Sequence, residues 1–256
     1  MVTQAAQGPP LPPPGPPREY VPYDPNKEPT FKGDQELRKG ADALRSGGES
    51  PFPQFVKKVG PDLYELGTIT LDQKAKRVRI PGRINMTNGI IEYLAVMDKR
   101  GKLHESVLAL DVQPSFMHLA LILLGLEPGE LAPGDPVTRK PPTMAKWGDP
   151  VLLWVEWDRE GKTERIPAGV LLFNRETQKP GETEWHFTGS FFNRGAFAAD
   201  VTGSLIATWP DFRAIINASS QAGNPYRGTN AGYEVNTKLV PPVDTPIRLV
   251  IEPAGK

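Results

Sequence analysis

Residues 89–126, GIIEYLAVMDKRGKLHESVLALDVQPSFMHLALILLGL, carry the clearest structural pattern in the chain. Two apolar segments that suit β-strands flank a polar turn from Asp98 to Gly101, and this arrangement is typical of a β-hairpin. In such a turn Gly101 is expected to take the left-handed conformation and to form a bulge. The pattern therefore predicts two neighbouring antiparallel strands.

A helix is predicted directly after this hairpin, over residues 114–124. Pro114 suits its first position and Gly125 suits its end. Apolar residues cover nearly the whole circumference, and a helix without a polar face is buried. We therefore interpret His118 as a core histidine with its polar atoms satisfied, in preference to a metal or substrate ligand.

The remaining sequence from residue 52 onward also reads mainly as strands. Residues 63–71 and 77–84 alternate apolar and polar side chains. Residues 151–174 repeat the hairpin pattern around Gly161, and further strands are expected over 183–192, 196–209 and 245–253. The expected fold is α+β and β-rich, with mostly antiparallel sheet and one buried central helix, in a single domain over residues 52–256.

Residues 1–51 are expected to form an extended arm that carries one short surface helix, since the sequence from Asp34 to Gly47 has a narrow apolar stripe. Proline fixes φ and removes hydrogen-bond donors, so the tract should be a semi-rigid polyproline II spacer. The arm is interpreted as a tether, or alternatively as a segment that docks on a protein partner. The prolines that would make this contact are Pro9, Pro10, Pro12, Pro13, Pro14, Pro16 and Pro17.

Composition excludes several classes of function. Thirty basic residues balance thirty acidic ones, so no net positive field favours nucleic acid. The absence of cysteine removes disulfides, thiolate metal sites and thiol catalysis. The longest apolar run, residues 116–126, is about half of the roughly 20 residues that a spanning helix needs. No signal peptide is recognised in the given chain, although a trimmed export signal stays possible.

The histidines and acids near the predicted hairpin are candidates for a chemical site. In an antiparallel hairpin Glu92 and His104 share one face and Glu105 lies on the other. Glu92 and His104 are then four residues apart along the strand, about 13 Å, which is too far to share one metal ion. They are expected to form a buried polar network. The alternative is a metal site built from His104, His118 and Glu105, but no HExxH or other metal-binding spacing supports it.

No catalytic residue and no cofactor is predicted, because no nucleophile elbow, P-loop or dinucleotide-binding fingerprint is present. The polar, glycine-rich region that precedes the last strand is the best place for a ligand site. One hypothesis places a pocket between Glu92 and residues 224–236. The candidate ligand-binding residues are Glu92, His104, Glu105, His118, Asn217, Tyr233, Glu234 and Asn236.

Several blocks of the sequence resemble the YdjY-domain family of bacterial proteins. The first holds an N-x-x-x-G-x-I-E-Y strand, a G-K-x-H-E-S return strand and a P-x-x-x-H-x-A-x-x-x-L-G helix. Later blocks include WHFTGSFF and YEVNTKLVPP, so the resemblance extends over about residues 63–251. It implies a domain of unknown function that is frequent in exported proteins, and it carries no accepted catalytic residues.

These observations together favour a non-catalytic binding or structural component of an exported, periplasmic bacterial assembly. The proline-rich arm would serve as its tether or docking segment. Two alternatives remain open at this point: a metal-dependent enzyme that uses histidine and carboxylate groups, and a small-ligand binding or sensor domain.

Overall fold

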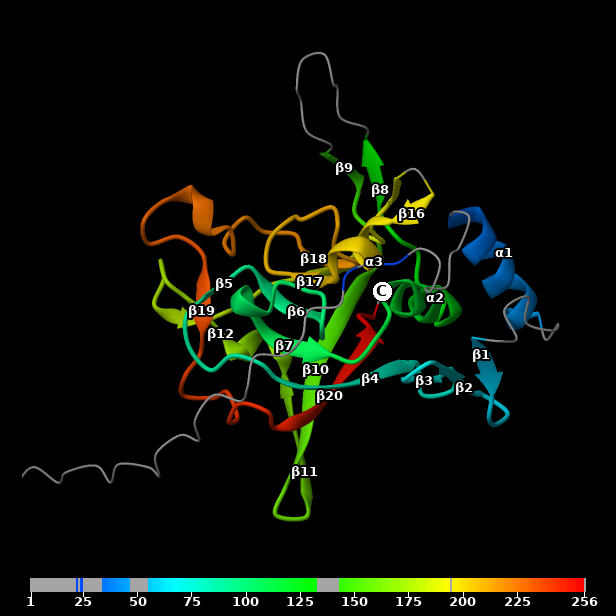
Figure 1. Cartoon of the computed structure of the whole chain (residues 1–256), viewed down its shortest axis with the longest axis horizontal. Coiled ribbons are helices and arrows are strands. Elements are labelled where there is room, and N and C mark those ends of the chain that lie inside the picture. The colour runs from blue at the N-terminus through cyan, green and yellow to red at the C-terminus, as the bar shows by residue number, and fades with distance from the viewer. Residues whose placement is uncertain are drawn as a thin grey trace, which may run out of the picture.

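The computed structural model describes residues 22, 24, 34–46, 55–132, 143–193 and 195–255. The proline tract predicted to form an extended arm lies outside these residues. Within the described part, the chain is rich in β-strands and has few helices (Figure 1).

A closed barrel of eight strands forms the centre of the fold. Each strand pairs with the next, and pairing between the first and the last closes the ring. In spatial order the strands are β4 (Arg77–Ile84), β20 (Pro246–Pro253), β10 (Pro150–Arg159), β14 (Trp185–Phe187), β18 (Ile216–Ala218), β17 (Ser204–Ala207), β6 (Tyr93–Met97) and β7 (Ser106–Leu110).

Other strands extend or flank this barrel. β3 (Ile69–Asp72), β2 (Leu63–Leu66) and β1 (Val56–Lys58) continue outward from β4, and β11 (Lys162–Pro167) pairs with β10. A separate sheet has the order β13 (Lys179–Pro180), β12 (Leu172–Asn174), β19 (Tyr233–Val235) and β5 (Ile90–Ile91). Two short hairpins complete the strands: β8 (Glu130–Ala132) with β9 (Thr143–Lys146), and β15 (Phe192–Asn193) with β16 (Ala196–Phe197).

The predicted hairpin around Asp98 to Gly101 is wrong, because β6 and β7 are parallel neighbours with Tyr93 opposite Ser106. After the turn, the chain runs back through the short 3₁₀ helix η1 (Leu103–Glu105) and only then starts β7. This return segment lets β7 run antiparallel to β4 and close the barrel. A turn signal between two apolar runs does not reveal that a third segment lies between them.

Gly101 is also required for a different reason from the one expected. Lys99, with φ 74°, holds the left-handed position in this turn, and Gly101 does not have a positive φ. A side chain at position 101 would overlap the Cβ of Val96, and a Cβ on Gly203 would lie 2.6 Å from the backbone nitrogen of Gly101. Gly101 is therefore needed for close packing of the turn against β6.

The second predicted hairpin is confirmed, because β10 and β11 are antiparallel and Arg159 lies opposite Lys162. Its two turn residues, Glu160 and Gly161, have φ 52° and 77°, which fits a type I′ turn and not the type I turn with a bulge expected from the first hairpin pattern. Three predicted strands are interrupted, however. Residues 63–71 form the hairpin β2 and β3, residues 183–192 contain only β14 and the start of β15, and residues 196–209 contain the helix α3 (Ala198–Thr202).

The buried central helix is confirmed as α2 (Pro114–Leu123). It ends at Gly125, which has φ 98°, and the amide of Leu126 donates to the carbonyl of Leu121 at 3.1 Å. At the other end, Asp200 of α3 accepts a hydrogen bond from the Ser115 amide at 2.8 Å. α1 (Asp34–Arg45) packs beside α2, as Figure 1 shows on the right. Among the described residues, none of the helices has both the length and the hydrophobicity of a membrane-spanning segment.

Candidate functional site

Glu92 is the central residue of the site that the fold assembles. It lies directly before β6, and its side chain is only 7% exposed. Its backbone is fixed on both sides, because its amide donates to the carbonyl of Glu105 and its carbonyl accepts from the amide and hydroxyl of Thr208. Removing an ionised carboxylate from water is costly unless donors reach it. The residues around Glu92 supply these donors.

Two side chains contact the carboxylate of Glu92. Lys102 places its Nζ 3.3 Å from Oε2, and the hydroxyl of Tyr226 donates to Oε1. Lys102 comes from the segment between β6 and β7, whereas Tyr226 comes from the 3₁₀ helix η3 (Pro225–Arg227). Glu92 thus connects two segments that are more than a hundred residues apart in sequence.

Lys102 joins a second acid to the first. Its Nζ lies 3.1 Å from Oε2 of Glu105, and His104 Nε2 lies 3.3 Å from the other oxygen of that carboxylate. The Lys102 ammonium also lies 5.6 Å from the centroid of the Tyr93 ring. Desolvation lowers the pKa of Lys102, but the carboxylates of Glu105 and Glu92 together raise its pKa above the ordinary value. The ammonium is therefore held in its charged form.

We call Glu92, Lys102, His104, Glu105 and Tyr226 the Glu92 cluster. It reaches solvent, because the side chain of His104 is 77% exposed and Tyr226 is 73% exposed. The Tyr226 ring contacts Trp209 edge to face, with centroids 6.2 Å apart. The hydrogen bond to Glu92 is the main reason that the pKa of Tyr226 is raised. The cluster therefore combines one buried carboxylate, that of Glu92, with an exposed aromatic side chain, that of Tyr226.

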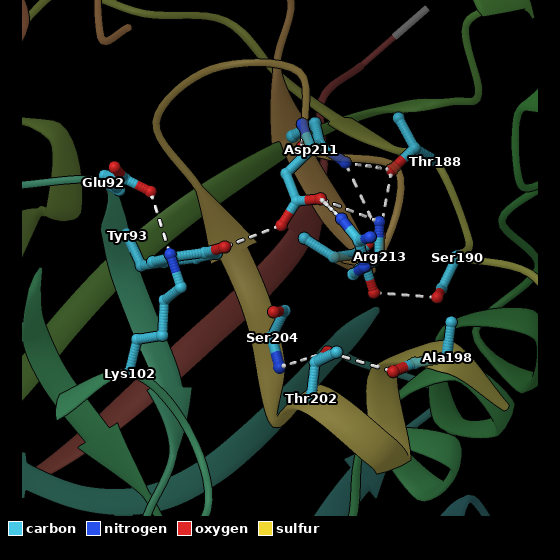
Figure 2. A network of polar contacts seen from close by, with 12 residues as sticks. Glu92, Tyr93, Lys102, Thr188, Ser190, Ala198, Thr202, Ser204, Asp211 and Arg213 are labelled. Carbon is cyan, nitrogen blue, oxygen red and sulfur yellow. Dashed lines mark hydrogen bonds and ion pairs between the residues drawn. The ribbon is translucent and has the colours of Figure 1, made fainter. Parts of the chain in front are cut away.

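A second polar network adjoins the cluster through Tyr93, as Figure 2 shows. The Tyr93 hydroxyl donates to Asp211 Oδ2 at 2.7 Å. The amide of Asp211 donates to Oδ1 of Asn217 at 2.7 Å, and Nδ2 of Asn217 donates to the hydroxyl of Thr188 at 2.6 Å. Burial, followed by the charge of Asp211, raises the pKa of Tyr93. This network ties β6, β18 and the loop after β17 together beneath the cluster.

The structure brings some of the predicted site residues together in a way that the hairpin model did not allow. Glu92, His104 and Glu105 belong to one cluster, so the prediction that Glu105 faces away from the other two is wrong. The physical reason is the return segment between β6 and β7. It brings the backbone of Glu105 alongside Glu92, with a hydrogen bond of 3.0 Å.

The other predicted residues lie elsewhere. His118 is buried on α2, with its ring 5.1 Å from Phe187 and 5.3 Å from Phe197. Asn217 belongs to the network beneath the cluster. Tyr233 and Glu234 lie in β19, and Asn236 follows that strand and donates to the Val170 carbonyl at 2.9 Å.

The predicted alternative metal site is not assembled. His104 contacts Glu105, whereas His118 lies among phenylalanines. Across the described ranges, no three histidine, aspartate or glutamate side chains are grouped so that they could hold a metal ion.

Sequence reasoning missed two members of the cluster, Lys102 and Tyr226, and the supporting Asp211. Lys102 lies inside the G-K-x-H-E-S segment, but it is not among the residues predicted for the site. Tyr226 stood in the loop that was singled out as the best place for a site. A turn lysine three residues before a glutamate was the available signal, although the pairing with Glu92 depends on the unexpected path of the chain.

A family model for the YdjY domain matches residues 69–252. The chain belongs to the YdjY-domain family. The matched residues contain all eight barrel strands apart from Pro253 at the end of β20, and all five residues of the Glu92 cluster lie within the match. Searches of curated proteins and of solved structures found no match to the chain.

Proposed function

We propose that this YdjY-domain protein is a non-catalytic binding component that recognises a protein partner at the Glu92 cluster. The observation that carries the proposal is the bond between the buried carboxylate of Glu92 and the hydroxyl of Tyr226. It fixes the loop around η3 against the barrel while the Tyr226 ring stays exposed. Exposed aromatic side chains held rigidly are the residues that contribute most to protein recognition.

The same geometry argues against acid or base catalysis by Glu92. A carboxylate that acts as a general acid or base has to come within hydrogen-bond reach of the substrate, and the side chain of Glu92 is only 7% exposed. Here one oxygen of Glu92 accepts from Tyr226 and the other contacts Lys102, both from the chain itself. These contacts are the ones expected of a structural support for the surrounding loop.

The proposal extends to the setting in which the protein works. We infer an exported, periplasmic component, with the proline tract as the tether or docking segment. Resemblance to a family frequent in exported proteins supports the location, and the donor-poor proline sequence supports the role of the tract. Changing the seven prolines of residues 9–17 to serine should alter the localisation or the assembly size of the protein, and an unchanged result in both would contradict the tether.

The binding proposal is tested by the size of the assembly in extracts of the native host. The full chain should elute in a complex larger than the monomer on size-exclusion chromatography. The double variant Trp209→Ala and Tyr226→Ala should elute as the monomer. Leu239→Ala, which also removes a surface apolar side chain, is the matched control and should behave as the unmodified chain.

Enzymatic catalysis is the second candidate function. The carboxylates of Glu92 and Glu105 both contact the ammonium of Lys102, at a site that solvent can reach. If this alternative holds, Glu105→Gln should abolish a turnover that the unmodified protein shows, while its assembly stays intact. A monomeric elution profile for the unmodified chain, together with such a turnover, would overturn the binding proposal.

A further inference from the structure

A cavity of about 720 Å³ lies on the outward face of β10, far along the chain from the Glu92 cluster. Side chains in β10 alternate between the two faces, and Val151, Leu153 and Val155 point into the core. The outward row consists of Pro150, Leu152 and Trp154, which are also apolar. Leu152 is 44% exposed, so this face of the strand has no complete cover from the described residues.

The barrel wall is interrupted at the same place. Along the edge of β10 that does not pair with β20, residues Trp154–Arg159 pair with β11, and Pro150 and Val151 pair with β14. Leu152 and Leu153 lie between these two ladders. Residues 167–184 pass over the gap and form the opposite wall of the cavity. The result is a groove between a strand and a loop, and not a closed internal hole.

Two polar atoms in the wall of this groove are buried without a hydrogen-bond partner among the residues that the structure describes. They are the indole Nε1 of Trp154 and the hydroxyl of Thr183. Both can donate a hydrogen bond. The groove therefore suits an occupant that is apolar and brings hydrogen-bond acceptors, and this combination describes a proline-rich segment well. Proline has a carbonyl acceptor but no amide donor, and polyproline helices bind in grooves lined by aromatic residues.

The charges at the edge of the groove also indicate which kind of segment could bind there. Glu182 and Glu184 are exposed at its rim, and within the described ranges neither forms an ion pair. In the sequence of this chain, the proline tract PPLPPPGPP of residues 9–17 is followed directly by Arg18. A polyproline helix advances about 3.1 Å per residue, so nine residues in this conformation span about 28 Å. Arg18 and then Glu19 follow the last proline, so the charge available to Glu182 and Glu184 is that of the Arg18 side chain and not a net charge of the tract.

We propose that this groove binds the proline-rich tract of the chain itself, residues 9–18. The tract lies over Leu152 and Trp154, its carbonyls accept from Trp154 Nε1, and Arg18 faces Glu182 and Glu184. This inference gives the tract a specific docking site and stands or fails independently of the Glu92 cluster.

The test is a titration in which the groove is left vacant and the tract is supplied separately. The protein is the full chain with the seven prolines of residues 9–17 changed to serine. The probe is a synthetic peptide of residues 8–20, and binding is measured by calorimetry. We expect saturable binding with one peptide per chain, and no binding of a peptide in which the same prolines are replaced by serine.

Variants of the groove then locate the contact. Trp154→Phe keeps an aromatic ring but removes the N–H, and should weaken peptide binding about tenfold, as expected for one lost hydrogen bond. Trp209→Phe, outside the groove, is the matched control and should leave binding unchanged. Glu182→Gln with Glu184→Gln should weaken binding and reduce its dependence on salt.

The substitutions at Glu182 and Glu184 are on the surface, so they keep the test informative if Trp154→Phe perturbs folding. Absence of binding at millimolar peptide would overturn the proposal. Binding that is equally strong in Leu152→Asp and in the glutamate variant would also overturn it, because the peptide would then be bound elsewhere.

Discussion

At the scale of single residues, Lys102 decides the character of the site. An ionised carboxylate away from water has a penalty of several kcal/mol, and donors with good geometry are needed to offset it. Lys102 reaches both Glu92 and Glu105, and the Tyr226 hydroxyl supplies a further donor to Glu92. The burial of Glu92 and the fixed position of the η3 loop are therefore two results of the same contacts.

Glu92→Gln should lower the pKa of Tyr226 toward its ordinary value of about 10. The wild-type pKa is raised because ionised Tyr226 would lose the hydrogen bond that it donates and would face a carboxylate. A neutral amide removes the like charge. The measurement is an NMR titration of tyrosine labelled at Cζ, with Tyr226→Phe used to assign the signal. An unchanged midpoint in Glu92→Gln would show that the two side chains do not interact in solution.

Tyr93 should make the stability of the fold depend on alkaline pH. Its pKa in the folded protein is raised by burial and by Asp211. The stabilisation that this raised pKa gives the folded protein is therefore complete below the unfolded pKa of about 10. It is lost as the pH rises above that value, because the tyrosine then ionises readily only in the unfolded chain. Each such tyrosine can lower the free energy of unfolding by up to about 1.4 kcal/mol per pH unit in this range.

Urea unfolding between pH 8 and pH 11 tests this expectation. Tyr93→Phe should lower the free energy of unfolding at pH 8, since the hydrogen bond to Asp211 is lost. It should also make the fall in the free energy of unfolding above pH 10 less steep. Tyr233 is also buried with a raised pKa, so part of the slope remains in the variant. Equal slopes for the variant and the unmodified protein would contradict the assignment to Tyr93.

At the scale of elements, the turn after β6 and the turn after β10 use glycine for different reasons. Gly161 has φ 77° with open space around its Cα, so Gly161→Ala adds backbone strain of about 1 kcal/mol. Gly101→Ala forces a methyl group into Val96, and should lower the free energy of unfolding by about 3 kcal/mol. Denaturant unfolding of the two variants gives the comparison, and equal losses would be inconsistent with close packing at Gly101.

The sequence was informative about elements whose signals are local. Pro114 and Gly125 marked the ends of α2, and Gly161 marked the second hairpin, because caps and tight turns depend on neighbouring residues. The direction of β7 could not be predicted in the same way. It depends on η1 and on pairing with β4, and neither contact is visible in a local pattern.

The site was predictable to a similar extent. Glu92, His104 and Glu105 stood out as polar residues in an apolar region, and the structure places them in one cluster. Their relative orientation followed from the wrong hairpin and was therefore wrong as well. The pairing of Glu92 with Tyr226 joins distant segments, and a single sequence carries no signal for such a contact.

At the scale of the whole molecule, closure of the barrel depends on Gly82. This glycine of β4 lies opposite Leu110 of β7, and an added Cβ would lie 2.5 Å from the Ala109 carbonyl oxygen and 2.6 Å from Leu110 Cδ2. Glycine within a strand often marks a place where another backbone comes close. The two ends of the eight-stranded ring meet at this position.

Gly82→Ala should therefore separate β4 from β7 and destabilise the protein by about 3 kcal/mol. Amide hydrogen exchange should rise first in residues 82–84 and 108–110, which form the closing pair. Gly60→Ala serves as the control, since its nearest neighbour is a side-chain atom at 3.3 Å. Exchange that rises uniformly over all strands would mean that the β4–β7 pair does not open before the rest of the barrel.

β20 lies between β4 and β10, although it follows every other described strand in the chain. During translation, the ribosome has to release residues 246–253 before the ring of hydrogen bonds can be joined. Until then, the nascent polypeptide has two unpaired strand edges, and such edges promote aggregation. A premature stop codon that removes only this last strand should consequently yield an insoluble product, even though the Glu92 cluster would still be encoded.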